Sequence, residues 1–331
     1  MNFFKTLVLC SSIFLIACQQ NNIKSDVVST KINQQSLQNE ARSEIDYAHF
    51  KNKQQDKPVI ALVLGSGGAR GYAHIGVIEV LEKNGIKPDL IVGTSAGSIA
   101  GSIYASGKSA NELKNIALNM QVNDVREFNI GIQGFFDGSK VENYVNQQVG
   151  NTALEDMKIP LYVVATELKQ GNKIVFNKGN TGQAVRASIS IPSMFVPVNI
   201  SGREYVDGGL VSPVPVNVAR DLGADIIIAV DILAQPIHTE TTNVWGMFNQ
   251  NINIMQNKLA AEELKNADIV IQPDLREKVH IFDVKGREAT MQSGVEAAQQ
   301  KLNRIELLVK TKTEELESNY SVKDKVKLTK Q

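Results

Sequence analysis

The chain has 331 residues, of which 43% are apolar, 21% are charged and 6% are aromatic. This composition is typical of a globular protein that buries a substantial core, and it excludes a chain that is disordered throughout. The 35 basic and 35 acidic residues balance, so no global positive field attracts nucleic acid, and we expect no nucleic-acid partner.

Residues 1–17 are typical of an export signal. Lys5 supplies a short positive region, and an apolar run from Leu7 to Ala17 follows it. The run is shorter than the roughly 20 apolar residues that span a bilayer, and its place at the N-terminus fits a signal peptide that is cleaved.

Cys18 ends the tetrapeptide Leu15-Ile16-Ala17-Cys18, which resembles the lipobox of bacterial lipoproteins. The resemblance implies that the Cys18 thiol is acylated and anchors the chain in a membrane of the bacterial cell envelope. Gln19, in place of an aspartate, favours the periplasm-facing side of the outer membrane. Cleavage leaves Cys18 as the single cysteine, so we expect no internal disulfide and no Cys-ligated metal site.

Residues 18–57 form the next segment, which is dominated by Gln, Asn, Ser and Lys. It has few large apolar residues and cannot bury enough surface to offset the entropy of ordering the chain. We predict a flexible tether that holds the folded body away from the bilayer.

Regular structure is predicted from Pro58. Residues 59–64 are a continuous apolar run, as expected of a strand that is buried on both faces. A Gly-rich loop at 65–71 follows, and the apolar residues of 73–81 have helical spacing. A strand, a tight loop and a helix in this order form the first half of a βαβ unit.

A second unit of the same kind follows, with a strand at 90–92, a turn at 93–97 and a helix of small residues at 99–105. Further strands are predicted at 161–165, 173–176, 225–230 and 268–271. The pattern predicts a single α/β domain over 58–310, with a mainly parallel sheet flanked by helices. A long terminal helix at 289–316 is predicted to end in a basic tail, so that 311–331 holds the helix end and the tail.

The pentapeptide Gly93-Thr94-Ser95-Ala96-Gly97 has the G-x-S-x-G pattern of a nucleophile elbow. A serine on such a strand-to-helix turn is forced out of the chain, and the flanking glycines Gly93 and Gly97 let the turn close. The positive end of the following helix favours an alkoxide or a developing oxyanion. We therefore predict Ser95 as a catalytic nucleophile.

The Gly-rich loop at 65–71 has two interpretations, because its backbone N–H groups can converge on an anion. A dinucleotide-binding loop requires a glycine where Arg70 stands, and its acidic residue would have to be Asp89, which precedes the next strand. An oxyanion hole at Gly67, Gly68, Ala69 and Arg70 fits better, with the amides of the first three facing the substrate. Arg70 has two open roles, which are fixing the loop and binding a phosphate.

The four histidines are candidates for a base that would activate the serine. His49 lies in the tether, and His74 is expected to pack or cap on the first helix. His238 and His280 follow an acidic candidate in the Ser, Asp, His order of α/β-hydrolases. A Ser–His–Asp esterase therefore remains one alternative.

Asp207 is the other candidate base. It lies in Tyr205-Val206-Asp207-Gly208-Gly209, where Gly208 and Gly209 allow a sharp turn that presents the carboxylate. A carboxylate can accept the serine proton directly if the site is dry enough to raise its basicity. A two-residue site of Ser95 and Asp207 is therefore consistent with the sequence.

The three blocks Gly65–Gly71, Gly93–Gly97 and Asp207–Gly209 resemble, in order and separation, those of the patatin-like phospholipase family. Residues 187–197 and 212–215 are similar to segments beside the family's aspartate. This resemblance implies a Ser–Asp dyad, an oxyanion hole from the Gly-rich loop, and hydrolysis of lipid acyl esters without a metal or other cofactor. Ser66 departs from the family pattern, which has a glycine there.

The sequence thus predicts two-step acyl transfer through Ser95 and Asp207, acting on an acyl lipid at the membrane that holds the anchor. Phospholipid, lysophospholipid, triacylglycerol and thioester substrates all fit this chemistry, and no oligomeric state is predicted. A lid is placed at 121–140. A non-catalytic module that binds nucleotide or lipid is the second alternative.

Overall fold

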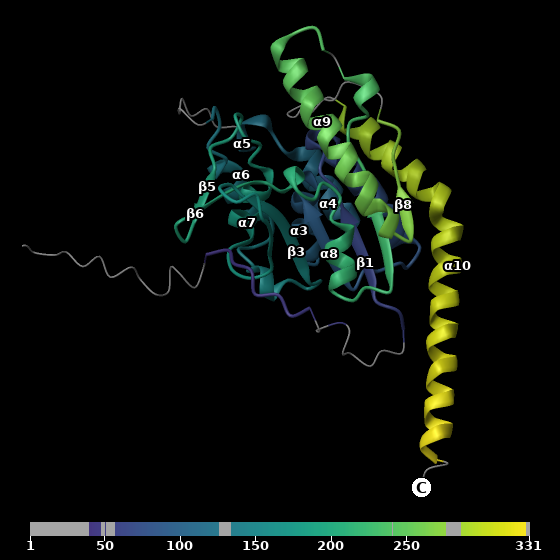
Figure 1. Cartoon of the computed structure of the whole chain (residues 1–331). Helices are drawn as coiled ribbons and strands as arrows, with labels where there is room; N and C mark the ends of the chain where they lie inside the picture. The colour runs from purple at the N-terminus through teal and green to yellow at the C-terminus, as the bar shows by residue number, and fades with distance from the viewer. Residues whose placement is uncertain are drawn as a thin grey trace, which may run out of the picture.

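The computed structural model describes residues 40–47, 50, 57–125, 134–239, 241–275 and 286–328 (Figure 1). The predicted signal peptide, Cys18, His49 and His280 lie outside the described residues, as do most of the tether and the middle of the predicted lid.

A mixed sheet of eight strands forms the centre of the described part of the chain. Its order is β5-β6-β3-β2-β1-β7-β8, and β4 pairs with β3. The strands are β1 (Ile60–Leu64), β2 (Leu90–Thr94), β3 (Leu161–Glu167), β4 (Lys173–Phe176), β5 (Val198–Ile200), β6 (Arg203–Asp207), β7 (Ile226–Val230) and β8 (Ile269–Ile271). The five strands from β3 to β8 along this order are parallel, and β4, β5 and β6 add antiparallel pairs at the other side. The predicted α/β class with a mainly parallel sheet is confirmed.

Helices cover both faces of the sheet. They are α2 (Tyr72–Lys83), α3 (Ala96–Ala105), α4 (Ala110–Asn119), α5 (Val122–Val125), α6 (Ser139–Gln148), α7 (Thr181–Ile189), α8 (Val216–Asp221), α9 (Val244–Glu263) and α10 (Arg287–Leu328). Every side chain of β1 is buried, and successive side chains of a strand point to opposite faces. Leu62 and Leu64 accordingly join the core beneath α2, α3 and α10, while Ala61 and Val63 join the core beneath α8.

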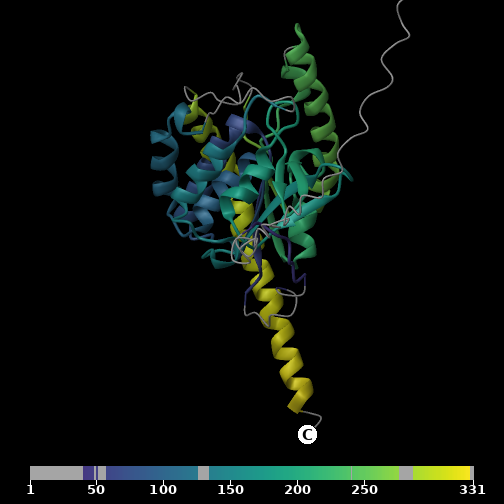
Figure 2. The same ribbon diagram turned by 90° about the vertical axis from the view of Figure 1, so that its left-hand side faces the viewer.

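The terminal helix α10 packs against α2 and then continues past the body of the protein (Figures 1 and 2). Two glycines allow the close approach, because a Cβ at Gly76 would collide with the Met291 carbonyl and a Cβ at Gly294 with that of Ala73. The helix begins two residues before the predicted start and ends at Leu328, 12 residues beyond the predicted end, so it includes most of the predicted basic tail. None of the described helices is both long enough and apolar enough to cross a bilayer.

Candidate active site

Ser95 stands on the turn between β2 and α3, with a φ of 53°. Positive φ is strained for a residue with a side chain and is a feature of functional turns. The neighbouring glycines are required sterically, since a Cβ at Gly97 would collide with the Leu64 carbonyl and one at Gly93 would lie 2.8 Å from the Gly97 oxygen. The G-x-S-x-G pattern thus follows from the tight packing of α3 on β1.

Asp207 ends β6 and faces the serine from the antiparallel part of the sheet. The Ser95 Oγ donates a hydrogen bond of 2.8 Å to Asp207 Oδ2, and the Gly209 N–H donates to Oδ1 at 2.5 Å. The Asp207 side chain is only 2% exposed, and burial raises its pKa to about 6, although both hydrogen bonds oppose the shift. The carboxylate is therefore more basic than an ordinary aspartate and is still ionised at neutral pH.

The Gly-rich loop continues β1 into a 3₁₀ turn at Gly68–Gly71. This turn lies against the first residue of α3, because a Cβ at Gly71 would come 2.8 Å from the Ala96 Cβ. The N–H groups of a first helical turn have no partner within that turn. Gly68 and Ala69 line the same hollow as Ser95, and the oxyanion hole at Gly67, Gly68, Ala69 and Arg70 stays a prediction.

Arg70 points away from that opening and braces the loop. Its Nε donates 2.8 Å to the Ile232 carbonyl, and its amide N–H donates 3.3 Å to the Gly67 carbonyl. Burial lowers the pKa of the guanidinium to about 10, and the nearby Asp231 carboxylate opposes the shift. Of the two roles left open for Arg70, these contacts describe loop fixation. The sequence offered no signal for Asp231, whose contact with the loop comes from the pairing of β1 with β7.

Two further serines support the elbow. The Ser188 hydroxyl on α7 accepts 2.8 Å from the Ser95 N–H and donates 2.6 Å to the Val164 carbonyl. Thr94 Oγ1 donates 2.9 Å to the Ser212 carbonyl, and the Ser212 hydroxyl donates 2.6 Å to Glu263 on α9. The resemblance singled out the segments that contain Ser188 and Ser212, but their contacts depend on tertiary structure.

His74 is fully buried on α2, and its Nε2 lies 2.8 Å from the Gly65 carbonyl. Burial lowers its pKa to about 4, so the ring is neutral and ties the start of the Gly-rich loop to α2. His238 ends a 3₁₀ turn at Pro236–His238, and the position of its side chain is not described. Within the described residues, His, Cys, Asp and Glu side chains do not gather in a group of three that could hold a metal.

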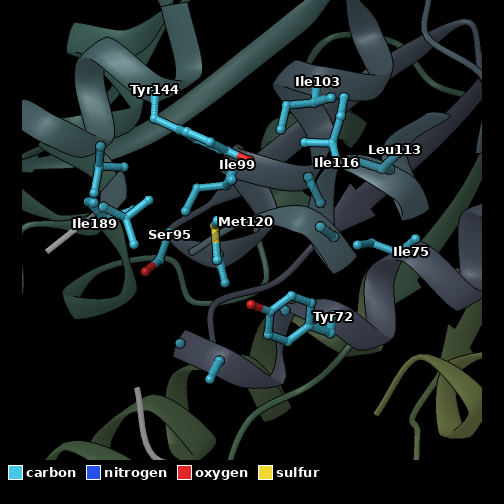
Figure 3. Close-up of a pocket in the computed structure, with 18 of the residues that line it drawn as sticks. Tyr72, Ile75, Ser95, Ile99, Ile103, Leu113, Ile116, Met120, Tyr144 and Ile189 are labelled. Carbon is cyan, nitrogen blue, oxygen red and sulfur yellow. The ribbon is translucent and has the colours of Figure 1, made fainter. Parts of the chain in front are cut away.

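Ser95 also lines an apolar hollow between the helices on one face of the sheet (Figure 3). The hollow encloses about 1130 Å³ including its open mouth. Its walls are mainly apolar side chains of α2, α3 and α4 and of the residue that follows α4, among them Ile75, Ile99, Ile103, Leu113, Ile116 and Met120. Such a lining suits a hydrocarbon chain, because it offers almost no hydrogen-bonding groups.

The chain is similar to several known proteins. Residues 62–220 match the family model described as patatin-like phospholipase. The chain is 36% identical over 188 residues to an NTE family protein of Mycobacterium tuberculosis, which corresponds to 56% of this chain and 52% of that protein. It is 29% identical over 218 residues to patatin-like phospholipase domain-containing protein 6 of Homo sapiens, or 62% of this chain and 16% of that protein. The matched part of the chain thus spans about half the length of the mycobacterial protein and a smaller share of the human protein.

Among solved structures, VipD from Legionella pneumophila has the same fold, with a TM-score of 0.52 at 14% identity. The match covers 81% of this chain and 70% of VipD. At this level of identity the likeness concerns the fold alone.

Proposed function

This chain belongs to the patatin-like phospholipase family, and we propose that it is a lipid hydrolase that cleaves acyl ester bonds of (phospho)lipids through a Ser95–Asp207 dyad. The observation that carries the proposal is the 2.8 Å hydrogen bond from Ser95 Oγ to a buried carboxylate, on a serine that also lines an apolar hollow. These two observations support the proposal, because it requires a nucleophile, a base and a site for an acyl chain.

In the first step, ionised Asp207 accepts the hydroxyl proton as Ser95 Oγ attacks the ester carbonyl carbon. The negative charge that develops on the carbonyl oxygen is stabilised by the amides of Gly68 and Ala69 and by the N-terminal end of α3. The carbon–oxygen bond to the alcohol then breaks, and the leaving oxygen takes the proton from Asp207. An acyl-enzyme on Ser95 remains.

In the second step, water attacks the acyl-enzyme while Asp207 accepts a proton from that water. Ser95 Oγ leaves with the proton returned by Asp207, and the fatty acid is released. The same carboxylate therefore acts as base and then as acid in each half of the cycle.

The competing Ser–His–Asp mechanism requires a histidine within hydrogen-bonding reach of Ser95. His74 is held by the Gly65 carbonyl, which leaves His238 and His280 as its candidates. Hydrolysis of a short-chain ester by wild type, Ser95→Ala, Asp207→Asn and the His238→Ala/His280→Ala double variant separates the mechanisms. Loss of turnover in Ser95→Ala and Asp207→Asn, with the double variant active, supports the dyad. Loss in Ser95→Ala and the double variant, with Asp207→Asn active, supports the triad.

We further propose that the protein is a lipoprotein of the bacterial envelope, anchored through an acyl chain such as palmitate on Cys18. The support is the lipobox-like sequence that ends at Cys18. An anchor would keep the site close to acyl lipids. Metabolic labelling with an alkyne analogue of palmitate should mark the wild type in the membrane fraction and should fail for Cys18→Ala; equal labelling of both would refute the assignment.

A further inference from the structure

Helix α9 turns its polar side chains toward the protein. Gln250 donates 3.1 Å to the Pro236 carbonyl, Asn253 donates 2.8 Å to Thr239 Oγ1, and Asn257 donates 2.8 Å to the Ala234 carbonyl. These residues recur at the spacing of one helical face. A surface helix of a globular protein usually buries its apolar stripe and exposes its polar one, so the arrangement in α9 is the opposite of the usual one.

The outward face of α9 carries large apolar side chains, which we call the α9 ridge: Val244, Met247, Ile254, Met255 and Leu259. Val244 is 88% exposed and Met255 58% exposed, and Ile237, in the turn before the helix, is 86% exposed. Lys258 is the one charged residue between Val244 and Ala261. Figures 1 and 2 show α9 at the outer edge of the fold, with its N-terminal end projecting beyond the sheet.

The inner side of α9 reaches the turn that follows Asp207. A Cβ at Gly209 would collide with the Gln256 amide, and the same glycine donates its N–H to Asp207. Phe135 is another exposed apolar side chain. Its N–H donates a hydrogen bond to the Met194 carbonyl, and the next residue, Phe195, lines the hollow. Exposed apolar side chains therefore stand on a helix that contacts the Asp207 turn and on a segment next to the wall of the hollow.

We propose that the α9 ridge docks on a lipid bilayer and inserts its apolar side chains among the acyl chains beside the active site. This inference rests on the proposed function, since a lipid hydrolase must draw substrate from a bilayer. A specific protein interface needs roughly one hydrogen bond per 100–200 Å², and the ridge supplies few groups for them. A bilayer needs none, and an apolar helix face can lie in its interfacial region. Because Lys258 is the one charged residue between Val244 and Leu259, the ridge binds by apolar burial rather than by attraction to anionic headgroups.

The chain's single tryptophan, Trp245, lies in the first turn of α9 and provides a site-specific test. The full chain carrying Ser95→Ala, which leaves the lipid intact, is mixed with phosphatidylcholine vesicles with and without brominated acyl chains. Docking should shift the Trp245 emission to the blue and quench it about twofold or more in the brominated vesicles, and about 0.5 M salt should leave both effects unchanged. An emission that is identical with and without vesicles would overturn the proposal, even if the chain is anchored elsewhere.

A variant with two aspartates on the ridge tests whether the ridge enters the bilayer. Met247→Asp with Met255→Asp should reduce the quenching about fivefold or more, because carboxylates resist burial in acyl chains. The matched control is Leu307→Asp, which charges an exposed leucine on α10 and should leave quenching intact. Equal loss in the control, or a blue shift that depends on protein concentration without vesicles, would refute docking on the bilayer, the latter in favour of a second copy. Hydrolysis of a soluble short-chain ester by the Ser95 protein tests the proposed function separately.

Discussion

The Ser188 hydroxyl accepts a hydrogen bond of 2.8 Å from the backbone N–H of Ser95, a residue 93 positions earlier in the chain. The same hydroxyl donates a hydrogen bond of 2.6 Å to the Val164 carbonyl on β3. The strained elbow is thus fastened from the side of α7, and the contact fixes the direction in which the nucleophile points.

Replacing Ser188 by alanine should therefore lower kcat about tenfold or more with little change in KM, because a misplaced nucleophile loses near-attack geometry. The variant should also lose roughly 1–3 kcal/mol of stability, since it leaves the buried Ser95 N–H without its partner. Ser102→Ala is the matched control. Its hydroxyl is also buried, but it bonds the Ile99 carbonyl within α3, so kcat should stay within about twofold of wild type. Equal kcat values for the two variants would contradict this role for Ser188.

The raised pKa of Asp207, about 6, predicts the pH dependence of the reaction. Only the ionised carboxylate can accept the Ser95 proton, so kcat/KM for a short-chain ester should rise about tenfold per pH unit below the midpoint and level off above it. Glu263 provides the control, because burial raises its pKa to about 7. A midpoint that moves in Glu263→Gln would show that Glu263, and not Asp207, controls the rise of kcat/KM with pH.

Asp207 should also make folding less favourable as the pH rises. The pKa of Asp207 is higher in the folded than in the unfolded protein, so the folded state binds the proton more tightly. The stabilisation that this proton gives to the folded state is lost as pH rises from about 4 to above 6. Asp207→Asn cannot ionise and should be more stable than wild type at about pH 8, by an amount on the order of 2 kcal/mol.

Thermal unfolding at several pH values measures this difference, which should vanish below about pH 4. Ser95→Ala retains the carboxylate and should not gain stability at high pH. A destabilised Asp207→Asn would mean that the carboxylate is held by interactions stronger than its cost of burial.

The apolar hollow predicts a preference for longer acyl chains. Ile103 lies on α3 two turns beyond Ser95, about 12 Å along the helix, and its side chain lines the hollow. Ile103→Trp should leave turnover of a butyrate ester within about threefold but reduce that of a dodecanoate ester about tenfold or more. Ile174→Trp, on β4 outside the lining, should reduce neither. Equal loss for both esters in Ile103→Trp would indicate that the acyl chain lies elsewhere.

Local patterns predicted the parts of the fold that depend on consecutive residues. The apolar runs of β1 and β2 and the turn at Ser95 follow from side chains and glycines close in sequence. The predicted strands at 161–165, 173–176, 225–230 and 268–271 agree closely with β3, β4, β7 and β8. The strands β5 and β6 escaped prediction, because Val-Asn-Ile and Arg-Glu-Tyr-Val-Asp contain polar residues and no apolar run longer than two residues.

The supporting contacts depend on which strands become neighbours, and spacing along the chain does not encode this. Ser188, Asp231 and Glu263 each act on a turn more than fifty residues away. Helix α9 shows a second limit, since helical periodicity identifies two faces but does not say which one meets the protein. Its amide-rich face turned inward because the carbonyls of the preceding loop, such as that of Ala234, needed donors.

In the proposed mechanism, Asp207 activates Ser95 for attack on an acyl carbon. The most direct test is the rate at which a fluorophosphonate labels the full chain, with the modified residue identified by peptide mass. We expect the label on Ser95, no label in Ser95→Ala, a rate reduced about 100-fold or more in Asp207→Asn, and a wild-type rate in the His238→Ala/His280→Ala variant. Labelling of Asp207→Asn as fast as wild type, with the double histidine variant inert, would contradict the claim and assign activation of the serine to a histidine.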